Sequence, residues 1–527
     1  MHSMLHAPTR QMRCERLCAL SVCLLAFGAP AVFADDSGAA ESCARGSEQQ
    51  TFWQRLADSY KAHLFPPEAP APDPNAPLAA PSGYDPDRGA APPESSTTWP
   101  YSTWPMGGTE TIGYENMTYG PLMDAIWCGR NGKKAKETRW TIYGWFEPGG
   151  NISTSNTNFN KVTGTGGNFP AAYSYQPNTV QLDQFALFFE RTPDEVQKDH
   201  FDWGFRFTGL YGTDYKYTFS DGIFSRQYTQ EERLNGFDPV MYYLDFYFPT
   251  MFYGMNLRIG RYISVPDIEA QLAPNNLTYS HSLLYTVDPY TQNGVVSTIK
   301  LNKNWTIQAE VSCGNDVGPF LAHECHTTPA LCVVWQSNSG NDEFYPCMNG
   351  LNDSNWRWNN IQHAVGTWYH KFNEKWHTDT EIWYMWEAHT PNVNNSAGVA
   401  FINANFPPQE FTIGAPDGAQ CVATVVFCYS YEWAVVNYIN YQYTEHDIFV
   451  WRTDFLNDAT AQRTGFKTRY AEFDLGYTHW VGDTIELRPE LRFERALDAE
   501  AYDNPTRTPN GGRKDQLMLA ADMILHF

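Results

Sequence analysis

Apolar and polar residues alternate in many short segments of the chain, and the clearest example is DTIELRPELRFER at residues 483–495. Ile485, Leu487, Leu491 and Phe493 fall on one face there and charged residues fill the other, because successive side chains of a strand point to opposite faces. A period of two predicts a β-strand with one oily and one charged face. About fourteen segments have this character, with ends defined to within a few residues: 139–147, 179–191, 200–211, 240–248, 254–262, 292–302, 304–313, 360–371, 375–387, 431–442, 445–456, 466–480, 483–496 and 516–527.

The connections between these segments alternate between short and long. Short turns are expected at 249–253, 303, 372–374, 443–444 and 481–482, and long loops at 148–178, 212–239, 263–291, 314–359, 388–430 and 497–515. A soluble sandwich has no reason to gather every long loop at one end, whereas outer-membrane barrels combine short periplasmic turns with long external loops. The pattern predicts an all-β fold, a transmembrane antiparallel β-barrel of about 14 strands, within a range of about 12–16.

Two further features fit this placement. Tryptophans lie beside the short turns, where an interfacial girdle of aromatic residues is expected: Trp140, Trp203, Trp305, Trp376 and Trp480. The C-terminal segment QLMLAADMILHF alternates apolar residues and ends on Phe527, which resembles the assembly signal of outer-membrane barrels. We therefore expect outer-membrane lipid and the barrel assembly machinery among the partners of the chain.

The residues before the barrel divide into three parts. Residues 1–34 have a positively charged start, a short apolar core and a small-residue end, and so predict a signal peptide. Residues 35–138 are expected to form an N-terminal periplasmic segment, with a short amphipathic helix at about 48–64 and a proline-rich linker at about 66–105. The barrel itself is predicted to occupy residues 139–527.

Composition excludes several classes of protein. The chain of 527 residues has a formal net charge of -23, which argues against nucleic acid because phosphate binding needs a basic face. After the N-terminus no clean run of about 18 apolar residues occurs, so no membrane-spanning helix is expected. Aromatic residues make up 15% of the chain and charged residues only 18%. These values leave a β-barrel as the expected membrane fold.

Cysteine usage indicates an oxidising compartment. Removal of the predicted signal leaves an even number of cysteines, and most of them crowd two segments: Cys313, Cys325, Cys332 and Cys347 in one, Cys421 and Cys428 in the other. Neither segment has a regular pattern, so we interpret both as disulfide-tied loops. The sequence His323-Glu324-Cys325-His326 invites zinc as an alternative, but it has no second ligand pair at a familiar spacing. We assign no metal and no cofactor.

Longer segments resemble a known family. GWFEPGGNISTSN, HFDWGFRFTGLYGTDYKYTF, GRYISVPDIEAQLAPNN, YTVDPYTQNG, LNDATAQRTGFKTRY and RPELRFERA are similar to segments of the OmpL-like β-barrel porin family. The similarity spans about residues 95–527 and includes WPYSTWP just before the barrel. The resemblance implies a bacterial outer-membrane location and channel activity, and it supplies no catalytic or binding residues. The sequence departs from the family mainly in the loops, where the extra cysteines lie.

In a barrel, the charged face of each strand should line the wet interior, because a lipid-facing Arg or Lys near the midplane costs roughly 2–4 kcal/mol. The pore-lining candidates are Arg206, Arg258, Lys300, Glu310, Asp379, Glu381, Arg452, Asp454, Glu472, Asp474, Glu486, Arg488, Glu490, Arg492 and Glu494. Their modest acidic excess predicts a weak preference for cations, unless the charges simply pair across strands. The segment PDIEAQLAPNN with Asp267 and Glu269 is interpreted as part of an external loop. Pro489 conflicts with its place in mid-strand, because it cannot donate to the ladder.

The leading functional hypothesis is a porin that lets small hydrophilic solutes or ions diffuse passively, with homo-oligomer formation left open. The alternative from another class is an outer-membrane barrel enzyme such as a lipid hydrolase, which needs a nucleophile paired with a base. His363, His370, His377 and His479 lie on predicted strands, but no serine motif stands beside them. A secreted sugar-binding β-protein would explain the tryptophans but neither the loop pattern nor the C-terminus. We therefore predict no enzyme and no catalytic residues.

Overall fold

The computed structural model describes residues 49–66, 85–88, 112–113, 119–159, 166–171, 173–229, 231, 233–263, 268–319, 325–357, 359–405, 418–444, 446–506 and 508–527. The predicted signal peptide and most of the proline-rich linker lie outside these residues. All the helices and strands named below belong to one compact unit, Cys43–Phe65 with Pro77–Phe527.

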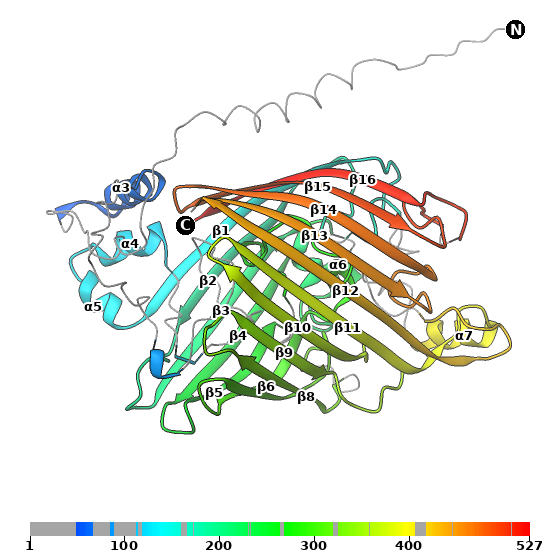
Figure 1. The fold of residues 1–527 in the computed structure, drawn as a ribbon, viewed down its shortest axis with the longest axis horizontal. Coiled ribbons are helices and arrows are strands. Elements are labelled where there is room, and N and C mark those ends of the chain that lie inside the picture. Colours follow the sequence, from blue (N-terminus) through cyan, green and yellow to red (C-terminus); the bar gives the residue numbers. More distant parts are fainter. Residues whose placement is uncertain are drawn as a thin grey trace, which may run out of the picture. The chain divides into compact units, whose positions relative to one another are not determined.

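Sixteen antiparallel strands form one closed barrel in which every strand pairs with its neighbours in the sequence and β1 closes on β16 (Figure 1). The strands are β1 (Trp140–Ser153), β2 (Val180–Arg191), β3 (Asp202–Gly212), β4 (Gly236–Phe248), β5 (Met255–Ile263), β6 (Thr291–Lys300), β7 (Trp305–Ser312), β8 (Thr328–Gln336), β9 (Asp342–Asn349), β10 (Gln362–Asn373), β11 (Trp376–Pro391), β12 (Phe427–Thr444), β13 (Asp447–Asp458), β14 (Thr468–Val481), β15 (Ile485–Ala496) and β16 (Asp515–His526). The predicted antiparallel barrel is confirmed.

The expected strand count of about fourteen missed one hairpin. Strands β8 and β9 lie inside the stretch 314–359, which was predicted to be a single long loop. Each is short and contains a proline, Pro329 or Pro346, which weakens the strand signal. Because the hairpin adds one further short turn between two longer loops, the alternation of loop lengths continues around the barrel. Long loops therefore gather at one end, the long-loop end, and tight connections at the other, the short-turn end.

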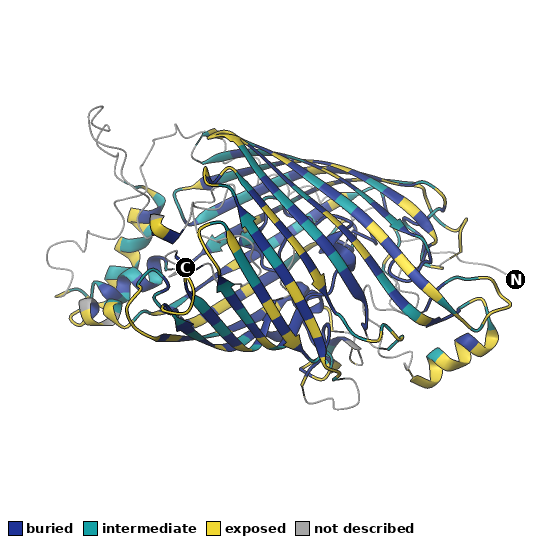
Figure 2. Ribbon diagram, turned by 60° about the horizontal axis from the view of Figure 1, so that its bottom comes forward, coloured by how far each residue is buried: buried dark blue, intermediate teal, exposed yellow. Residues whose placement is uncertain are grey.

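Exposure alternates along the strands, as Figure 2 shows by bands of buried and exposed residues. In β15, Leu491 and Phe493 are exposed, while Glu490, Arg492 and Glu494, which alternate with them, are buried. This assigns the apolar face to the outside and the charged face to the interior, as expected from the cost of placing charge in lipid. Pro489 leaves the register unchanged: pairing with β14 stops after Gly476↔Glu490 and resumes at His479↔Leu487. The strand thus tolerates the missing donor by a local gap in the ladder rather than by a bulge.

Aromatic residues mark the outer rim at the short-turn end. Trp140, Trp203, Trp305 and Trp376 are exposed there, as an interfacial girdle requires. The prediction was wrong for Trp480, which is buried and stacks on His526 with 5.3 Å between ring centroids. Trp480 is two residues after Thr478 and six after Asp474, so it lies on the same inward face of β14 as they do. The alternation of side chains along the strand therefore decides its direction, although it lies near the turn.

Among the described residues, three α-helices precede the barrel: α3 (Phe52–Leu64), α4 (Pro121–Trp127) and α5 (Gly132–Glu137). Helix α3 begins at Thr51, whose hydroxyl accepts a hydrogen bond from the Gln54 amide in a capping box. A fourth helix, α7 (Ser396–Asn405), lies in the long connection between β11 and β12, and α6 (Arg226–Thr229) is a single turn. Among the described residues, no helix is both long and apolar enough to cross a membrane.

Helix α3 is fixed to the short-turn end of the barrel by His63. Its Nδ1 lies 2.8 Å from Asp483 in the β14–β15 turn, and its Nε2 lies 2.8 Å from Asp124 of α4. Burial by itself would lower the pKa of His63, but the hydrogen bonds to Asp124 and Asp483 outweigh it and raise the pKa to about 9. Gly482 adopts φ +62°, and a Cβ there would meet the His63 carbonyl oxygen at 2.0 Å. The turn therefore requires glycine both for its conformation and for the approach of α3.

The predicted disulfide cysteines form three pairs, Cys313–Cys325, Cys332–Cys347 and Cys421–Cys428. Cys128 is disulfide-bonded as well. The interpretation as loop ties is wrong for Cys332 and Cys347, which face each other across β8 and β9 in the barrel wall. His323 and Glu324 of the alternative zinc site lie outside the described residues, and no set of three metal-binding side chains assembles in the part of the chain that is described.

Candidate pore and the segment that narrows it

The interior of the barrel is lined by charged side chains from nearly every strand. Arg206 is 14% exposed, and the remaining pore-lining candidates are buried on the inner face: Arg258, Lys300, Glu310, Asp379, Glu381, Arg452, Asp454, Glu472, Asp474, Glu486, Arg488, Glu490, Arg492 and Glu494. Their burial means that side chains from loops or other strands cover most of them. Which of these charged side chains border a solute path depends on where the covering loops lie inside the barrel.

One side of the interior, the inner faces of β13–β16, is here called the sealed wall. Arg452 lies 2.8 Å from Glu472 and 3.1 Å from Asp474. Arg492 lies 3.0 Å from Glu472 and 2.7 Å from Glu494. These ion pairs join each arginine to two carboxylates on the same or the adjacent strand. Buried charge is tolerated in a protein when it is paired in this way.

A third arginine extends the network to the barrel seam. Arg488 of β15 pairs with Asp522 of β16 and, at 3.3 Å, with Glu147 of β1. Glu147 and Asp522 were not among the predicted residues, although strand parity places Asp522 inward together with Gln516 and His526. The ion-pair network therefore crosses the β1–β16 closure of the barrel.

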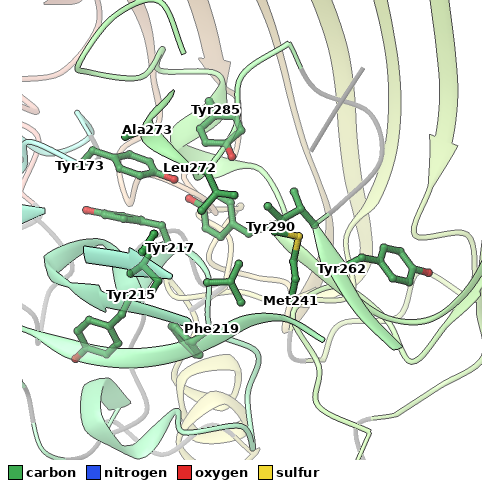
Figure 3. Packing of buried hydrophobic residues seen from close by; sticks show 14 of the residues in the cluster. Tyr173, Tyr215, Tyr217, Phe219, Met241, Tyr262, Leu272, Ala273, Tyr285 and Tyr290 are labelled. Carbon is green, nitrogen blue, oxygen red and sulfur yellow. The ribbon is translucent and has the colours of Figure 1, made fainter. Parts of the chain in front are cut away.

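The loop between β5 and β6 folds into the barrel, and its described part, residues 268–290, is here called the inner segment. The prediction of an external loop was wrong for this part of it, and Asp267 lies outside the described residues. The inner segment is almost wholly buried, and Figure 3 shows some of its residues packed among side chains of neighbouring strands and loops. A buried loop must satisfy its backbone polar groups from elsewhere, and here the sealed wall does so.

The three arginines supply donors to the inner segment. Arg488 Nη1 donates to the carbonyls of Ala273 and Asn276 at 2.6 and 2.8 Å. Arg452 Nη1 donates to the Ser280 carbonyl at 2.6 Å and to the Thr278 hydroxyl at 2.8 Å. Guanidinium groups suit this role because their fixed fork of N–H donors can serve a carboxylate and a carbonyl at once.

Carboxylates of the strands accept hydrogen bonds from the same segment. The backbone N–H of Ser280 donates to Glu490 Oε2 at 3.0 Å, and that of Leu283 donates to Asp454 Oδ2 at 2.8 Å. At the start of the segment, Ile268 N–H donates to Glu381 Oε2 at 2.8 Å. Predicted lumen charges on β11, β13 and β15 thus serve as anchors for the inner segment.

Aromatic rings pack the inner segment against other loops. Tyr173 stacks on Tyr217 and on His281, with ring centroids 4.2 and 3.7 Å apart, and Tyr285 stacks on His281 at 4.9 Å (Figure 3 shows the tyrosines). Burial lowers the pKa of His281 well below its usual value, so its ring is neutral and Nε2 donates to the Ala270 carbonyl at 2.7 Å. The loops from β1–β2, β3–β4 and β5–β6 therefore form one aromatic cluster inside the barrel.

The opposite wall comprises the inner faces of β3–β9. Arg258 pairs with Asp245 at 2.9 Å and lies 3.9 Å from the centre of the Tyr243 ring. Arg206 pairs with Glu190. Hydrogen bonds join the inner segment to β2, to β11 and to strands β13–β15. Exposure alone does not separate the two walls, because Lys300 and Glu310 are 4% exposed while Glu472 of the sealed wall is 5% exposed.

The strand histidines of the enzyme alternative have acidic rather than serine neighbours. His370 Nδ1 lies 2.6 Å from Asp342, and His479 Nδ1 lies 2.7 Å from Asp447. His363 is buried inside the barrel, 3.7 Å from Asp288. These pairings belong to the polar lining and to the short-turn rim of the barrel.

Comparison with known proteins adds a family. The sequence model described as "Putative beta-barrel porin-2, OmpL-like" matches residues 140–527, which are the barrel. No curated protein matches the chain.

Solved structures with similar folds include the anion-selective porin from Comamonas acidovorans, at 10% identity and a TM-score of 0.43, covering 74% of this chain and 99% of that one. The outer membrane channel DcaP of Acinetobacter baumannii has 8% identity and a TM-score of 0.43, with 74% and 97% covered. The low-pH structure of Pseudomonas putida OprB has 9% identity and a TM-score of 0.38, with 75% and 95% covered. At these TM-scores the family assignment rests on the sequence match alone.

Proposed function

We propose that this chain, which belongs to the OmpL-like β-barrel porin-2 family and is a channel of the bacterial outer membrane, conducts ions and small hydrophilic solutes along its opposite wall, β3–β9. The inner segment occupies the side of the sealed wall and narrows the passage to the remaining half of the interior. Barrels of about 16 strands are wide enough for an aqueous channel, so one inserted segment restricts the pore without filling it.

The observation that carries this proposal is the anchoring of the inner segment to the sealed wall. Its strand contacts include the arginines of β13 and β15, while Lys300 and Glu310 on β6 and β7 receive none of its hydrogen bonds among the described residues. We take the inward charges that do not hold the inner segment as those that lie beside the solute path. The channel role, rather than an enzymatic one, agrees with the family and with the absence of a serine partner for the described strand histidines His370 and His479.

The charges along this path favour cations. Arg206, Arg258 and Arg261 are neutralised by Glu190, Asp245 and Asp238, and Asp202 of β3 pairs with Arg191. The other charged groups of the opposite wall are Lys300, Glu310 and Glu343, and Asp379 follows on β11. One cation against three carboxylates leaves the path acidic, and such an excess biases ion passage.

Planar-bilayer recording in a KCl gradient tests the proposal. We expect stepwise conductance and a reversal potential on the cation-selective side, and Glu310→Gln with Asp379→Asn should move that potential toward the anion-selective side. Glu486→Gln is the matched control, because it removes one carboxylate from the sealed wall, where exposure is 0%. A reversal potential that responds equally to Glu486→Gln and to the double variant would contradict a path along the opposite wall. A folded barrel that never conducts would contradict the proposed function itself.

We further propose that the short-turn end faces the periplasm, together with α3–α5, and that the long-loop end faces outward. Short periplasmic turns are the usual arrangement in such barrels. The C-terminal strand ends at this end, where Phe527 stacks on Phe185 with 6.0 Å between ring centroids. Its outward Leu517, Leu519 and Met523 are exposed and available for recognition by the assembly machinery. Protease accessibility of the β15–β16 loop in intact cells tests the orientation.

A further inference from the structure

Basic side chains gather on the outer surface at the long-loop end of the last three strands. The cluster, here called the basic rim, consists of five exposed residues: Lys467, Arg469, Arg495, Arg513 and Lys514. The chain has 36 basic residues against 59 acidic ones, so a cationic surface stands out against the overall charge. Arg469 and Arg495 occupy outward positions of β14 and β15, and the other three lie exposed in the adjoining loop ends.

The five residues lie close together because their strands are neighbours. Arg495 of β15 is directly opposite Asp515 of β16 and Ala471 of β14. Arg513 Nη1 reaches the Thr154 carbonyl at the end of β1, 2.6 Å away. Since neighbouring strands are about 4.8 Å apart, the rim covers a surface on the order of 10–15 Å wide.

Only part of the positive charge is neutralised. Arg469 makes a bidentate pair with Asp498, at 2.8 and 2.9 Å, and Arg495 pairs with Asp515 at 2.7 Å. Arg513 and Lys514 donate instead to backbone carbonyls, of Thr154 and Leu497. Within the described part of the chain, Lys467, Arg513 and Lys514 form no ion pair, and the nearby loop adds the half-buried Glu500 and Asp503, so five basic residues stand against four acidic ones, Asp498, Glu500, Asp503 and Asp515. The rim therefore keeps a positive excess.

The surface directly below the rim is apolar. Outward positions of the same three strands carry exposed Phe473, Leu491, Phe493, Leu517 and Leu519. Arg495 follows Phe493 by two residues on the same face, a rise of about 7 Å. The basic rim therefore stands where the hydrocarbon of the bilayer gives way to its headgroups.

We propose that the basic rim binds phosphate groups on the headgroups of outer-leaflet glycolipids. Arginine and lysine recognise phosphate through charge-assisted hydrogen bonds, and the apolar surface below the rim would contact the acyl chains of the same lipid. The position on the outer leaflet uses the orientation proposed above. The rim is on the outer face of the barrel, so lipid binding does not depend on conduction.

The test compares binding of purified full-length protein, in neutral detergent, to diphosphorylated lipid A. The variant K467Q/R513Q/K514Q leaves the two ion-paired arginines in place to preserve the fold. Each basic residue at an anionic surface contributes roughly fivefold, so we expect the triple variant to bind roughly a hundredfold more weakly. Native mass spectrometry of the protein–lipid complex gives the readout, and added salt should reduce wild-type binding.

A second triple variant, K134Q/K303Q/K375Q, removes the same charge from exposed positions at the short-turn end and should bind like the wild type. Dephosphorylated lipid A should bind the wild type as weakly as lipid A binds the rim variant. Equal lipid binding by the wild type and the rim variant, or an equal loss in the control variant, overturns the proposal. So does complete displacement by inorganic phosphate at the lipid's own concentration, because free phosphate would then be the ligand. Bilayer conductance of the rim variant should match the wild type.

Discussion

The two walls of the barrel interior contain similar residues and use them differently. On the sealed wall, Arg452, Arg488 and Arg492 each bind carboxylates of the strands and polar groups of the inner segment. On the opposite wall, Arg258 pairs with a strand carboxylate and packs against a tyrosine ring. The difference shows that an inward charge is no evidence of a pore by itself. What decides is whether a loop uses that charge as an anchor.

The largest effect is expected from Arg452→Gln. This change leaves Asp474 without its ion-pair partner and Glu472 with Arg492 alone, and it removes donors from Thr278 and Ser280. Removing one partner of a buried ion pair costs about 3–5 kcal/mol, and the inner segment loses an anchor. We expect a lower unfolding temperature in a heat-modifiability assay and, in bilayers, a larger single-channel conductance.

Arg258→Gln is the matched comparison, because Arg258 is a buried arginine of the opposite wall whose carboxylate partner, Asp245, lies on the adjacent strand. It should also lower the unfolding temperature, since Asp245 then loses its partner. The conductance, however, should stay near the wild-type value. An increase as large as that of Arg452→Gln would remove the distinction between the two walls.

A second prediction concerns the β8–β9 hairpin of the opposite wall, whose ladder is interrupted. The β8–β9 ladder pairs Cys332↔Cys347 and then resumes at Trp335↔Phe344, with Pro346 in the gap. The disulfide between the two strands closes a sequence separation of 15 residues, for which cross-linking contributes about 3 kcal/mol. The double change Cys332→Ala with Cys347→Ala should therefore destabilise the barrel by roughly that amount.

The disulfide Cys421–Cys428 serves as the comparison. Its sequence separation is 7, and only Cys428 lies in a strand, near the start of β12 at the long-loop end. Replacing both cysteines by alanine should lower the unfolding temperature less than the change in β8 and β9. Equal losses measured by heat-modifiable gel migration would show that the β8–β9 bridge does not compensate for the interrupted ladder.

The parts of this fold that were predictable are those controlled by nearest neighbours in a strand. Residues 483–496 were expected as a strand and β15 spans Ile485–Ala496, because alternation and burial agree at almost every position. The β8–β9 hairpin was missed because Pro329 and Pro346 interrupt the signal within two short strands. Trp480 was misplaced because nearness to a turn was given more weight than strand parity.

The inner segment could not be placed from the sequence. Its residues mix Ser, Thr and Asn with large apolar and aromatic types, and its anchors are far away in the chain: Ala273 and Arg488 are 215 residues apart. The one available signal was an excess of large apolar residues for a surface loop, including Leu272, Leu283, Leu284 and Tyr285, all of which are buried. Because such contacts depend on barrel closure, local patterns do not reveal them.

The smallest effect is expected at His63, which holds α3 to the short-turn end beside the sealed wall. The pKa of His63 is raised from its ordinary value to about 9. The protonated ring therefore stabilises the docking of α3 in full below about pH 6.5, and this stabilisation is lost as the pH rises through about 9. The contribution is on the order of 2 kcal/mol after allowance for solvent at Asp483. A spin label at the exposed Ala57 should become mobile between these pH values in the wild type, and should be mobile at every pH in His63→Gln.

His200→Gln is the control for this change, because His200 forms an exposed pair with Asp199 in another short turn. The label should report the same docking as in the wild type, since an exposed pair of this kind contributes about 0–1 kcal/mol. Release of α3 should leave the conductance unchanged, because Asp483 belongs to the β14–β15 turn and the proposed path follows β3–β9. If His63→Gln altered conductance as strongly as Arg452→Gln, the helix would have to act on the passage, and the short-turn end of the sealed wall would belong to the pore.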